Sequence, residues 1–145
     1  MAEPWADGDV LTAAHLALVP WGLVGAVVTS ADQTGISAIA DITGLTVTWT
    51  ATASRTYVTF VKASVRKITN AGDAFIHLTD GAGGQKDGSP VTLGVNDYGT
   101  LTAIAIETGL SGSITRKARA SASSATVTVL GASNYTSSIL VFDIG

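Results

Sequence analysis

The sequence contains no cysteine, and few of its residues are charged. The first absence excludes disulfides, thiolate metal sites and thiol catalysis. Charged residues make up 13% of the 145 residues, against 46% hydrophobic residues, and the net charge is −3. Because about 25–35% of a well-behaved soluble surface is charged, this composition favours a chain that hides much of its surface in an oligomer or a larger particle. A soluble β-surface rich in threonine and serine is the alternative interpretation.

Long hydrophobic runs are also missing. The longest, residues 17–28, is interrupted by Pro20, Gly22 and Gly25, and it is shorter than the roughly 20 residues of a membrane-spanning helix. The amino terminus carries acidic residues where a signal peptide needs basic ones. A net charge of −3 gives no general attraction to nucleic acids or anionic lipids. We therefore expect neither membrane insertion nor a nucleic-acid partner.

The segment 45–68 predicts two long strands joined by a short polar turn at residues 52–55. Leu45, Val47 and Trp49 alternate with threonines, which is the period-two pattern of a strand with one buried face. Between Tyr57 and Val61 both faces of the second strand are apolar. A strand of this kind is covered twice, which indicates a second sheet within the subunit and a further contact with another subunit.

Strand patterns continue along the rest of the chain, separated by Gly, Asn, Asp and Ser. The predicted strands are residues 25–29, 36–42, 45–51, 56–69, 73–79, 101–107, 113–121, 125–130 and 137–144. Nine short strands without alternating helices predict an all-β, antiparallel sandwich or barrel. Residues 81–98 form the longest region without a clear strand, although residues 91–93 could add a short one.

The first 22 residues differ from this pattern and predict an arm ahead of a β-domain at residues 23–145. Thr12 is a suitable N-cap for a short helix over residues 13–19, which Pro20 ends. A two-turn helix is unstable alone in water, so it must dock on its own domain, a neighbouring subunit or a larger particle. The docking residues that we expect are Trp5, Leu11, Leu16, Leu18 and Trp21.

A glycine cluster at residues 81–88 is the only candidate phosphate loop, and it fails on spacing. In G-x-G-x-x-G the third glycine would fall on Lys86, and Asp87 follows where a P-loop needs Ser or Thr. Asp80, Asp87 and Asp97 could bind calcium, but they lack the ligand spacing of an EF-hand loop. We expect a hairpin loop here and no cofactor or metal site, while ion binding by the segment 80–97 stays open.

Candidate catalytic residues are few. His15 and His77 fall in different predicted elements, no Gly-x-Ser-x-Gly motif occurs between a strand and a helix, and Glu107 is the only acid inside a predicted strand beside apolar neighbours. A histidine in an assembled β-protein is more often a satisfied surface or interface residue than a catalyst. The sequence therefore predicts a protein that is not an enzyme.

Basic residues gather in two predicted strands, as Arg66 with Lys67 and as Arg116, Lys117 and Arg119. Lys117 and Arg119 share one face of their strand, whereas Arg116 points to the other face. We interpret them as solvated residues or as partners of acidic residues in another subunit. An anionic glycan is the alternative partner.

The largest core contribution is expected from Trp49. Leu140, Phe142 and Ile144 share one face of the last strand and are expected to line the same interior. The residues predicted for the trimer interface or the core are Trp49, Tyr57, Phe60, Val61, Leu140 and Phe142.

Several motifs resemble those of small virion proteins of tailed bacteriophages, particularly phages of actinobacteria. The stretch 5–16 is similar to a W-x-x-G-x-x-L-T-A-A-x-L arm of minor tail and virion surface proteins. Residues 41–51 followed by 54–57 are similar to their "tGlsvtf-ta-aGrtY" strand pair, with Ser54 where glycine is commoner. The tetrapeptide 78–81 and the ending 140–145, Leu-Val-Phe-Asp-Ile-Gly, also match.

The resemblance implies a jelly-roll β-sandwich of the kind seen in tumour necrosis factor-like homotrimers, tethered by the N-terminal arm, without catalytic residues. It implies a protein made in the host cytoplasm and located on the virion surface, with the major capsid protein or another virion protein as partner. We expect a decoration protein that reinforces the capsid, because no heptad or collagen repeat for a tail-fibre stalk is present. A minor tail protein that binds a host-surface glycan is the alternative.

Overall fold

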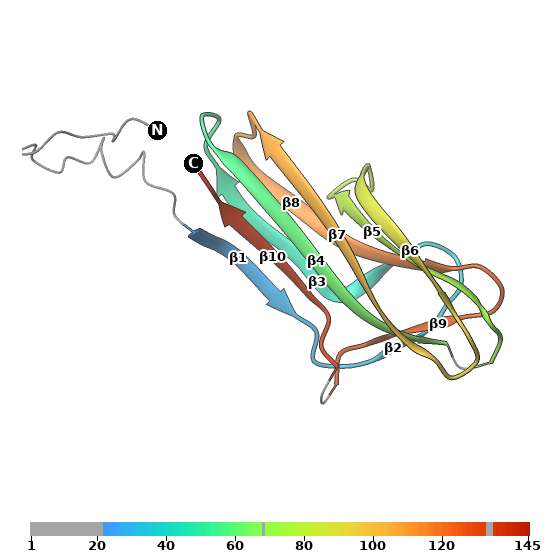
Figure 1. Ribbon diagram of the computed structural model, residues 1–145. Coiled ribbons are helices and arrows are strands. Elements are labelled where there is room, and N and C mark those ends of the chain that lie inside the picture. Colours follow the sequence, from blue (N-terminus) through green and yellow to red (C-terminus); the bar gives the residue numbers. More distant parts are fainter. Residues whose placement is uncertain (1–21, 68, 133–134) are drawn as a thin grey trace, which may run out of the picture.

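The computed structural model describes residues 22–67, 69–132 and 135–145, and these residues form strands and loops (Figure 1). The strands are β1 (Gly22–Val28), β2 (Gln33–Ile36), β3 (Ala40–Ala51), β4 (Thr56–Lys67), β5 (Gly72–Asp80), β6 (Gln85–Leu93), β7 (Tyr98–Thr108), β8 (Gly112–Ala122), β9 (Val127–Leu130) and β10 (Ser138–Asp143). Within the described ranges no helix is long and apolar enough to cross a membrane.

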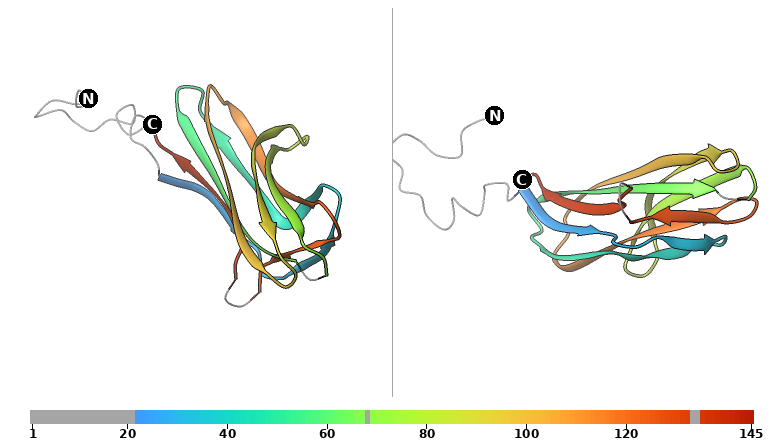
Figure 2. Two further views of the ribbon diagram at one scale, coloured as in Figure 1. Left: turned by 45° about the vertical axis from the view of Figure 1, so that its right-hand side comes forward. Right: turned by 90° about the horizontal axis from the view of Figure 1, so that it is seen from below.

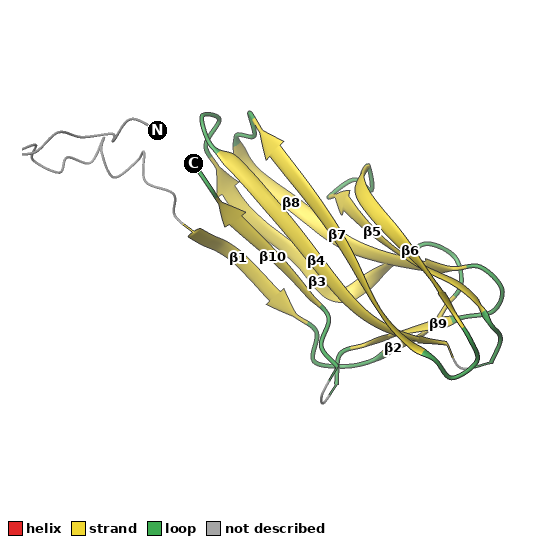
Figure 3. Cartoon of the chain, viewed as in Figure 1, coloured by secondary structure: helices red, strands yellow, loops and turns green. Residues whose placement is uncertain are grey.

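The strands pair into two antiparallel sheets that pack face to face (Figure 3). The four-stranded sheet has the order β3-β8-β5-β6. In the six-stranded sheet, β4 pairs with β7 along one side. Along its other side, β4 pairs first with β10 and then with β9. The outer strands β1 and β2 pair with β10 and β9, respectively.

This connectivity is that of a jelly roll. If the two short strands β2 and β9 are set aside, eight long strands remain in chain order. One sheet then contains strands 1, 8, 3 and 6 of this series, and the other contains strands 2, 7, 4 and 5. This is the double Greek-key order of jelly rolls. The expected all-β, antiparallel jelly-roll sandwich is confirmed, while the predicted arm and helix lie outside the described residues.

The core lies between the two sheets. Leu45, Val47 and Trp49 of β3 are buried, and the intervening threonines are exposed, as their alternation predicts. On the inner face of β4, Val61 and Val65 are likewise buried. The expected pair of long strands at residues 45–68 is therefore confirmed, with a turn at residues 52–55.

Two strand predictions need correction. The predicted strand at residues 36–42 spans a break, because β2 ends at Ile36 and β3 begins at Ala40. More importantly, residues 81–98 contain the nine-residue strand β6, of which the sequence indicated only residues 91–93. Gly88 and Pro90 disguise it, since both are unfavourable inside a strand. They are tolerated because β6 is an edge strand that pairs only with β5.

Side chains of β6 also reach the free edge of β7 in the other sheet. The Asp87 carboxylate accepts a hydrogen bond of 2.7 Å from the backbone N–H of Ile104. The Ser89 hydroxyl donates one of 2.6 Å to the carbonyl oxygen of Thr102. These two backbone groups of β7 have no partner in a neighbouring strand, and side chains from the other sheet satisfy their hydrogen bonds.

One end of the core contains a lysine. Lys67 follows Val61 and Val65 on the inner face of β4, and its side chain is fully buried. Its ammonium group donates to the carbonyl oxygens of Ser123 (2.6 Å) and Ser124. Ser124 adopts a left-handed backbone conformation with a φ of 51°. This turn directs both carbonyl groups at the lysine and so compensates part of the cost of burying its charge.

Candidate functional site

The outer face of the six-stranded sheet carries two continuous apolar rows. In the first row, Leu23 of β1, Phe142 of β10, Val58 of β4 and Ile106 of β7 are register partners. In the second row, the register partners are Ala26, Leu140, Phe60 and Ile104. We call these eight residues the apolar rows. They lie opposite the buried faces of their strands, because side chains alternate along a strand.

These apolar rows are exposed to solvent in the single chain. Ile106 is 69% exposed and Ile104 is 47% exposed, although both are large aliphatic residues. Val58 and Phe60 in the centre are half-buried. The next row toward the middle of β4 is polar on three strands, with Lys62 opposite Thr102 and Ser138, and it ends at the exposed Val28 of β1. A contiguous apolar patch across four strands is typical of a surface that another protein covers.

The outer face of the four-stranded sheet has the opposite character. Most of its exposed positions on β3 are threonines, and two hydroxyls, of Thr48 and Thr115, lie 2.9 Å apart. Lys117 and Arg119 of β8 both approach Asp41, at 3.0 and 2.8 Å. The hydrogen bond from Lys117 holds the pKa of Asp41 below its usual range. The basic residues of this face are therefore partnered by an acid of their own chain.

The six residues predicted for the interface or the core divide between two surfaces. Trp49, Tyr57 and Val61 are buried between the sheets. The other three, Phe60, Leu140 and Phe142, belong to the apolar rows on the outer face. The five predicted arm residues, Trp5, Leu11, Leu16, Leu18 and Trp21, lie outside the described part of the chain.

The predicted orientation of the last strand is wrong. Ile139, Val141 and Asp143 of β10 face the interior, and Leu140 and Phe142 face outward. The sequence placed Leu140, Phe142 and Ile144 in the interior instead. Asp143 is buried because the guanidinium of Arg55 forms a salt bridge with its carboxylate. Its other oxygen accepts a hydrogen bond from the backbone N–H of Gly145 at 3.1 Å.

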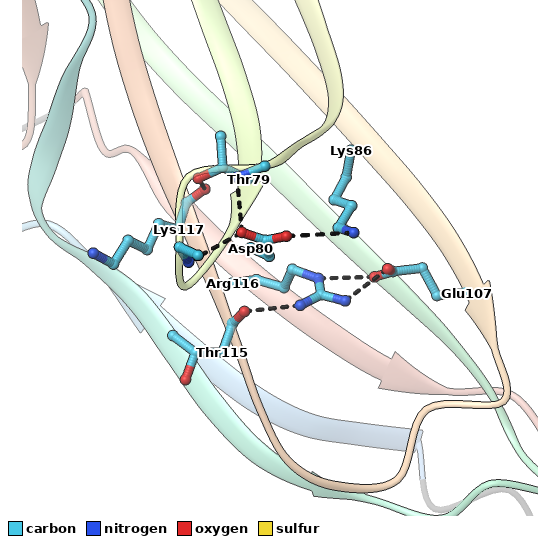
Figure 4. Close-up of polar contacts among 9 residues, drawn as sticks. Thr79, Asp80, Lys86, Glu107, Thr115, Arg116 and Lys117 are labelled. Atoms are coloured by element: carbon cyan, nitrogen blue, oxygen red, sulfur yellow. Dashed lines mark hydrogen bonds and ion pairs between the residues drawn. The ribbon is translucent and has the colours of Figure 1, made fainter.

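The interpretation of Arg116 as a solvated or intersubunit residue is also wrong, because this side chain is buried between the sheets (Figure 4). Its guanidinium donates two hydrogen bonds to the carboxylate of Glu107, of 2.8 and 2.6 Å. A third donor reaches the carbonyl oxygen of Thr115 at 2.8 Å. The same guanidinium lies 5.8 Å from the centre of the Trp49 ring. Glu107, the acid that the sequence singled out, is thus held in a structural ion pair.

In the glycine cluster at residues 81–88, residues 81–84 form the turn between β5 and β6, and the rest begin β6. The Asp80 carboxylate accepts hydrogen bonds from the backbone N–H groups of Ala82 (3.0 Å) and Gly84 (2.8 Å), which lower the pKa of Asp80. Lys86 lies 3.5 Å from the same carboxylate (Figure 4). The expected hairpin turn is confirmed. Among the described residues no group of three or more His, Asp or Glu side chains is arranged to hold a metal ion.

His77 lies on the outer face of the four-stranded sheet, as its position between Ile76 and Leu78 predicts. Its ring stacks on Phe75 at 6.3 Å between centroids, and Nε2 lies 3.0 Å from the Ser121 hydroxyl. Burial of the ring lowers the pKa of His77, and the charge of Arg119 acts in the same direction. The imidazole is therefore a neutral partner of a serine near pH 7.

A shallow recess of about 270 Å³ lies where β1 ends and β2 begins, and the sequence gave no sign of it. Asp32, the acid in its lining, is already engaged. One carboxylate oxygen accepts hydrogen bonds from the backbone N–H groups of Gly131 (2.9 Å) and Ala132 (3.1 Å). These bonds lower the pKa of Asp32. Its role is to hold the loop after β9 against the start of β2.

No protein-family model matches the chain, and no curated protein matches it. Among solved structures it is similar to Eiger TNF from S. frugiperda, at 10% identity over 86% of this chain and 94% of that one, with a TM-score of 0.48. It is also similar to the tripod (BppUct-A-L) from the baseplate of bacteriophage Tuc2009, at 14% identity over 99% of this chain and 74% of that one, with a TM-score of 0.44. The jelly-roll assignment itself rests on the strand order and register of this chain.

Proposed function

We propose that the chain is a non-enzymatic structural protein of a tailed-bacteriophage particle. In this proposal three copies associate into a trimer, and the N-terminal arm of residues 1–22 anchors them on the capsid, which they decorate and reinforce. The phage assignment and the number of three copies are supported by the sequence motifs that resemble virion proteins with tumour necrosis factor-like domains. The observation that carries the proposal of self-association is the exposed pair of apolar rows.

The occupant of the apolar rows is proposed to be another copy of the same chain. Burying apolar surface contributes about 25 cal/mol for each Å² removed from water. All eight positions of the rows are uncharged, so copies can approach each other through the rows themselves without like-charge repulsion. The scarcity of charge in the whole sequence, 13% of residues, agrees with a surface that is partly hidden by assembly.

The position of the arm supports a tether. Gly22, the first residue of β1, pairs with Asp143 near the C-terminus, and Leu23 is part of the first apolar row. Figure 2 shows the start of β1 and the C-terminus at the same end of the sandwich. If the apolar rows are buried between copies, the arms of all copies leave beside the interface at one end. They can then reach a single site on the particle together.

Two carboxylates paired with arginines support a structural role. Glu107 is tied to Arg116 and Asp143 to Arg55. Both carboxylates accept hydrogen bonds from arginine side chains of their own chain. These acids act as fixed links between elements of the sandwich.

Self-association is tested by the mass of the protein in solution. We expect native mass spectrometry to give three times the 14.6 kDa of one chain. Ile106→Asp places a charge in the apolar rows and should release folded monomers. The matched control is Thr50→Asp, an exposed strand position on the outer face of the other sheet, which should leave the trimer intact. A wild-type monomer at micromolar concentration would overturn the proposal.

Anchoring is tested by removing residues 1–21, which keeps Gly22 in β1. The truncated protein should fold and associate normally, yet fail to join particles. Native occupancy on particles would show that the arm is not the tether. Labelling the protein on intact particles distinguishes capsid decoration from the alternative location on the tail.

A further inference from the structure

Two tyrosines stack on each other at the surface, far from the apolar rows. Tyr98 begins β7, and Tyr135 lies between β9 and β10. Their ring centroids are 5.2 Å apart with an angle of 20° between the planes. Tyr98 is 50% exposed and Tyr135 is 48% exposed. The remaining tyrosine, Tyr57, is buried, so the exposed pair is not explained by packing of the core.

An arginine lies against the tyrosine pair. The guanidinium carbon of Arg66 is 5.0 Å from the centre of the Tyr98 ring. Its Nη2 donates a hydrogen bond of 3.1 Å to Asn96 Oδ1, and Asn96 has a left-handed backbone with a φ of 64°. Arg66 Nε is shielded from solvent and has no hydrogen-bond partner within the described residues. The result is a stack of two exposed aromatic rings, with a guanidinium against Tyr98 that is held in place by Asn96.

We propose that Tyr98, Tyr135 and Arg66 form a saccharide-binding site. One face of a sugar ring is lined by C–H groups and can pack on an exposed tyrosine ring, which is amphipathic and rigid. The hydroxyl oxygens at the edge of the sugar can accept hydrogen bonds from the guanidinium of Arg66. Exposed aromatic rings with a few well-placed polar groups are the chemistry that this class of ligand needs.

A nucleic acid is the competing ligand, because bases also stack on tyrosines and arginines. Binding of its phosphates depends on several cationic contacts. Here a single arginine accompanies the rings, and the net charge of the chain is −3. The saccharide is therefore the better match.

The site lies at the end of the sandwich opposite to the start of β1. Arg66 is ten residues along β4 from Thr56, which is about 33 Å in an extended strand. Thr56 pairs with the backbone of Gly145 at the end where the arm begins. A site at the far end stays open to solvent when the arm end faces a particle. Saccharide binding by the purified protein does not depend on the proposed function, since it needs neither a particle nor an interface.

The experiment uses the full-length protein with maltohexaose, laminarihexaose and hexagalacturonate as probes. Saturation-transfer NMR is expected to detect at least one of them, with a Kd of about 1 mM or tighter. Tyr98→Ala and Tyr135→Ala should each weaken binding about tenfold, and Arg66→Gln should also weaken it. Tyr135→Phe, which keeps the ring, should bind within about threefold of wild type. The control Phe75→Ala removes a ring from the other sheet and should bind as wild type.

Four results would overturn the proposal. The first is that none of the three probes binds at roughly 10 mM. The second is unchanged binding by Tyr135→Ala, which lies outside the strands and should fold normally. The third is tighter, tyrosine-dependent binding of a thymidine oligonucleotide than of any sugar. The fourth is dissociation of the assembly by Tyr98→Ala, which would make the tyrosine pair an interface between copies.

Discussion

Removing one partner of the ion pair between Glu107 and Arg116 is expected to be among the most destabilising changes to polar groups of this domain. Glu107 belongs to the six-stranded sheet and Arg116 to the four-stranded sheet. Their side chains are 16% and 6% exposed, and two hydrogen bonds join them. Glu107→Ala leaves the Arg116 charge inside the protein without its carboxylate. Removing one partner of a buried pair costs about 3–5 kcal/mol, a large share of the about 5–15 kcal/mol that stabilises a typical domain.

The assay is urea unfolding at a fixed protein concentration, because association of copies also contributes to apparent stability. The three variants are Glu107→Ala, Arg116→Met and the double variant. We expect the double variant to lose less stability than the sum of the single losses, by about 0.5–3 kcal/mol. In the double variant no uncompensated charge is left inside, and Met fills part of the space of the arginine side chain.

The matched control is Lys117→Met, which removes a residue next to Arg116 on the opposite face of β8. Lys117 and Asp41 are 29% and 49% exposed, and Asp41 keeps Arg119 as a partner. Its loss should be about 0–1 kcal/mol. If Glu107→Ala loses no more stability than this control, or if the two single losses simply add, the pair does not link the sheets as we reason.

Two other predictions follow from burial and charge. Trp49→Ala should lower the free energy of unfolding by about 3–5 kcal/mol, whereas Phe142→Ala, on the outer face, should mainly weaken association of the copies. Thermal unfolding at a series of protein concentrations separates the two effects. If both variants lose the same stability at every concentration, the assigned faces are wrong. Because the pKa of Asp41 is lowered in the folded protein, its stabilising effect is present above the unfolded pKa of about 3.9 and is lost as the pH falls through the lower folded value. The deficit of Asp41→Asn in urea unfolding should therefore shrink between pH 6 and pH 3, and a deficit that grows would refute the role of this charge.

Much of the fold could be predicted because most strands alternate clearly. The threonines between Leu45, Val47 and Trp49 identify the wet face of β3 without any knowledge of the partner strand. The strand β6 escaped because Gly88 and Pro90 oppose local strand formation. Its position is set by pairing with β5, which follows from tertiary structure.

The surfaces of the sandwich were harder to predict than its strands. On β10 both faces carry apolar residues, so alternation alone does not decide which face is buried. The residue that pairs with the inward-facing Asp143, Arg55, is 88 positions away in the sequence. Similarly, the sequence placed Arg116 on the face opposite to Lys117, but it did not reveal the acid inside that accepts its charge. Charged side chains normally lie on the protein surface, but an ion pair with a residue distant in the sequence allows them to be buried.

The contacts of Asp87 and Ser89 with β7 oppose edge-to-edge association of copies of this chain. A bare strand edge can add a strand from another molecule, and repetition of that step gives open-ended fibrils. Here the N–H of Ile104 and the carbonyl of Thr102 are already occupied by side chains of the same molecule. Growth along the hydrogen-bonding direction of the sheet is blocked at these two groups, while the outer face stays available. Copies that associate through the outer faces of their six-stranded sheets can form a closed ring around a symmetry axis, which limits the number of copies.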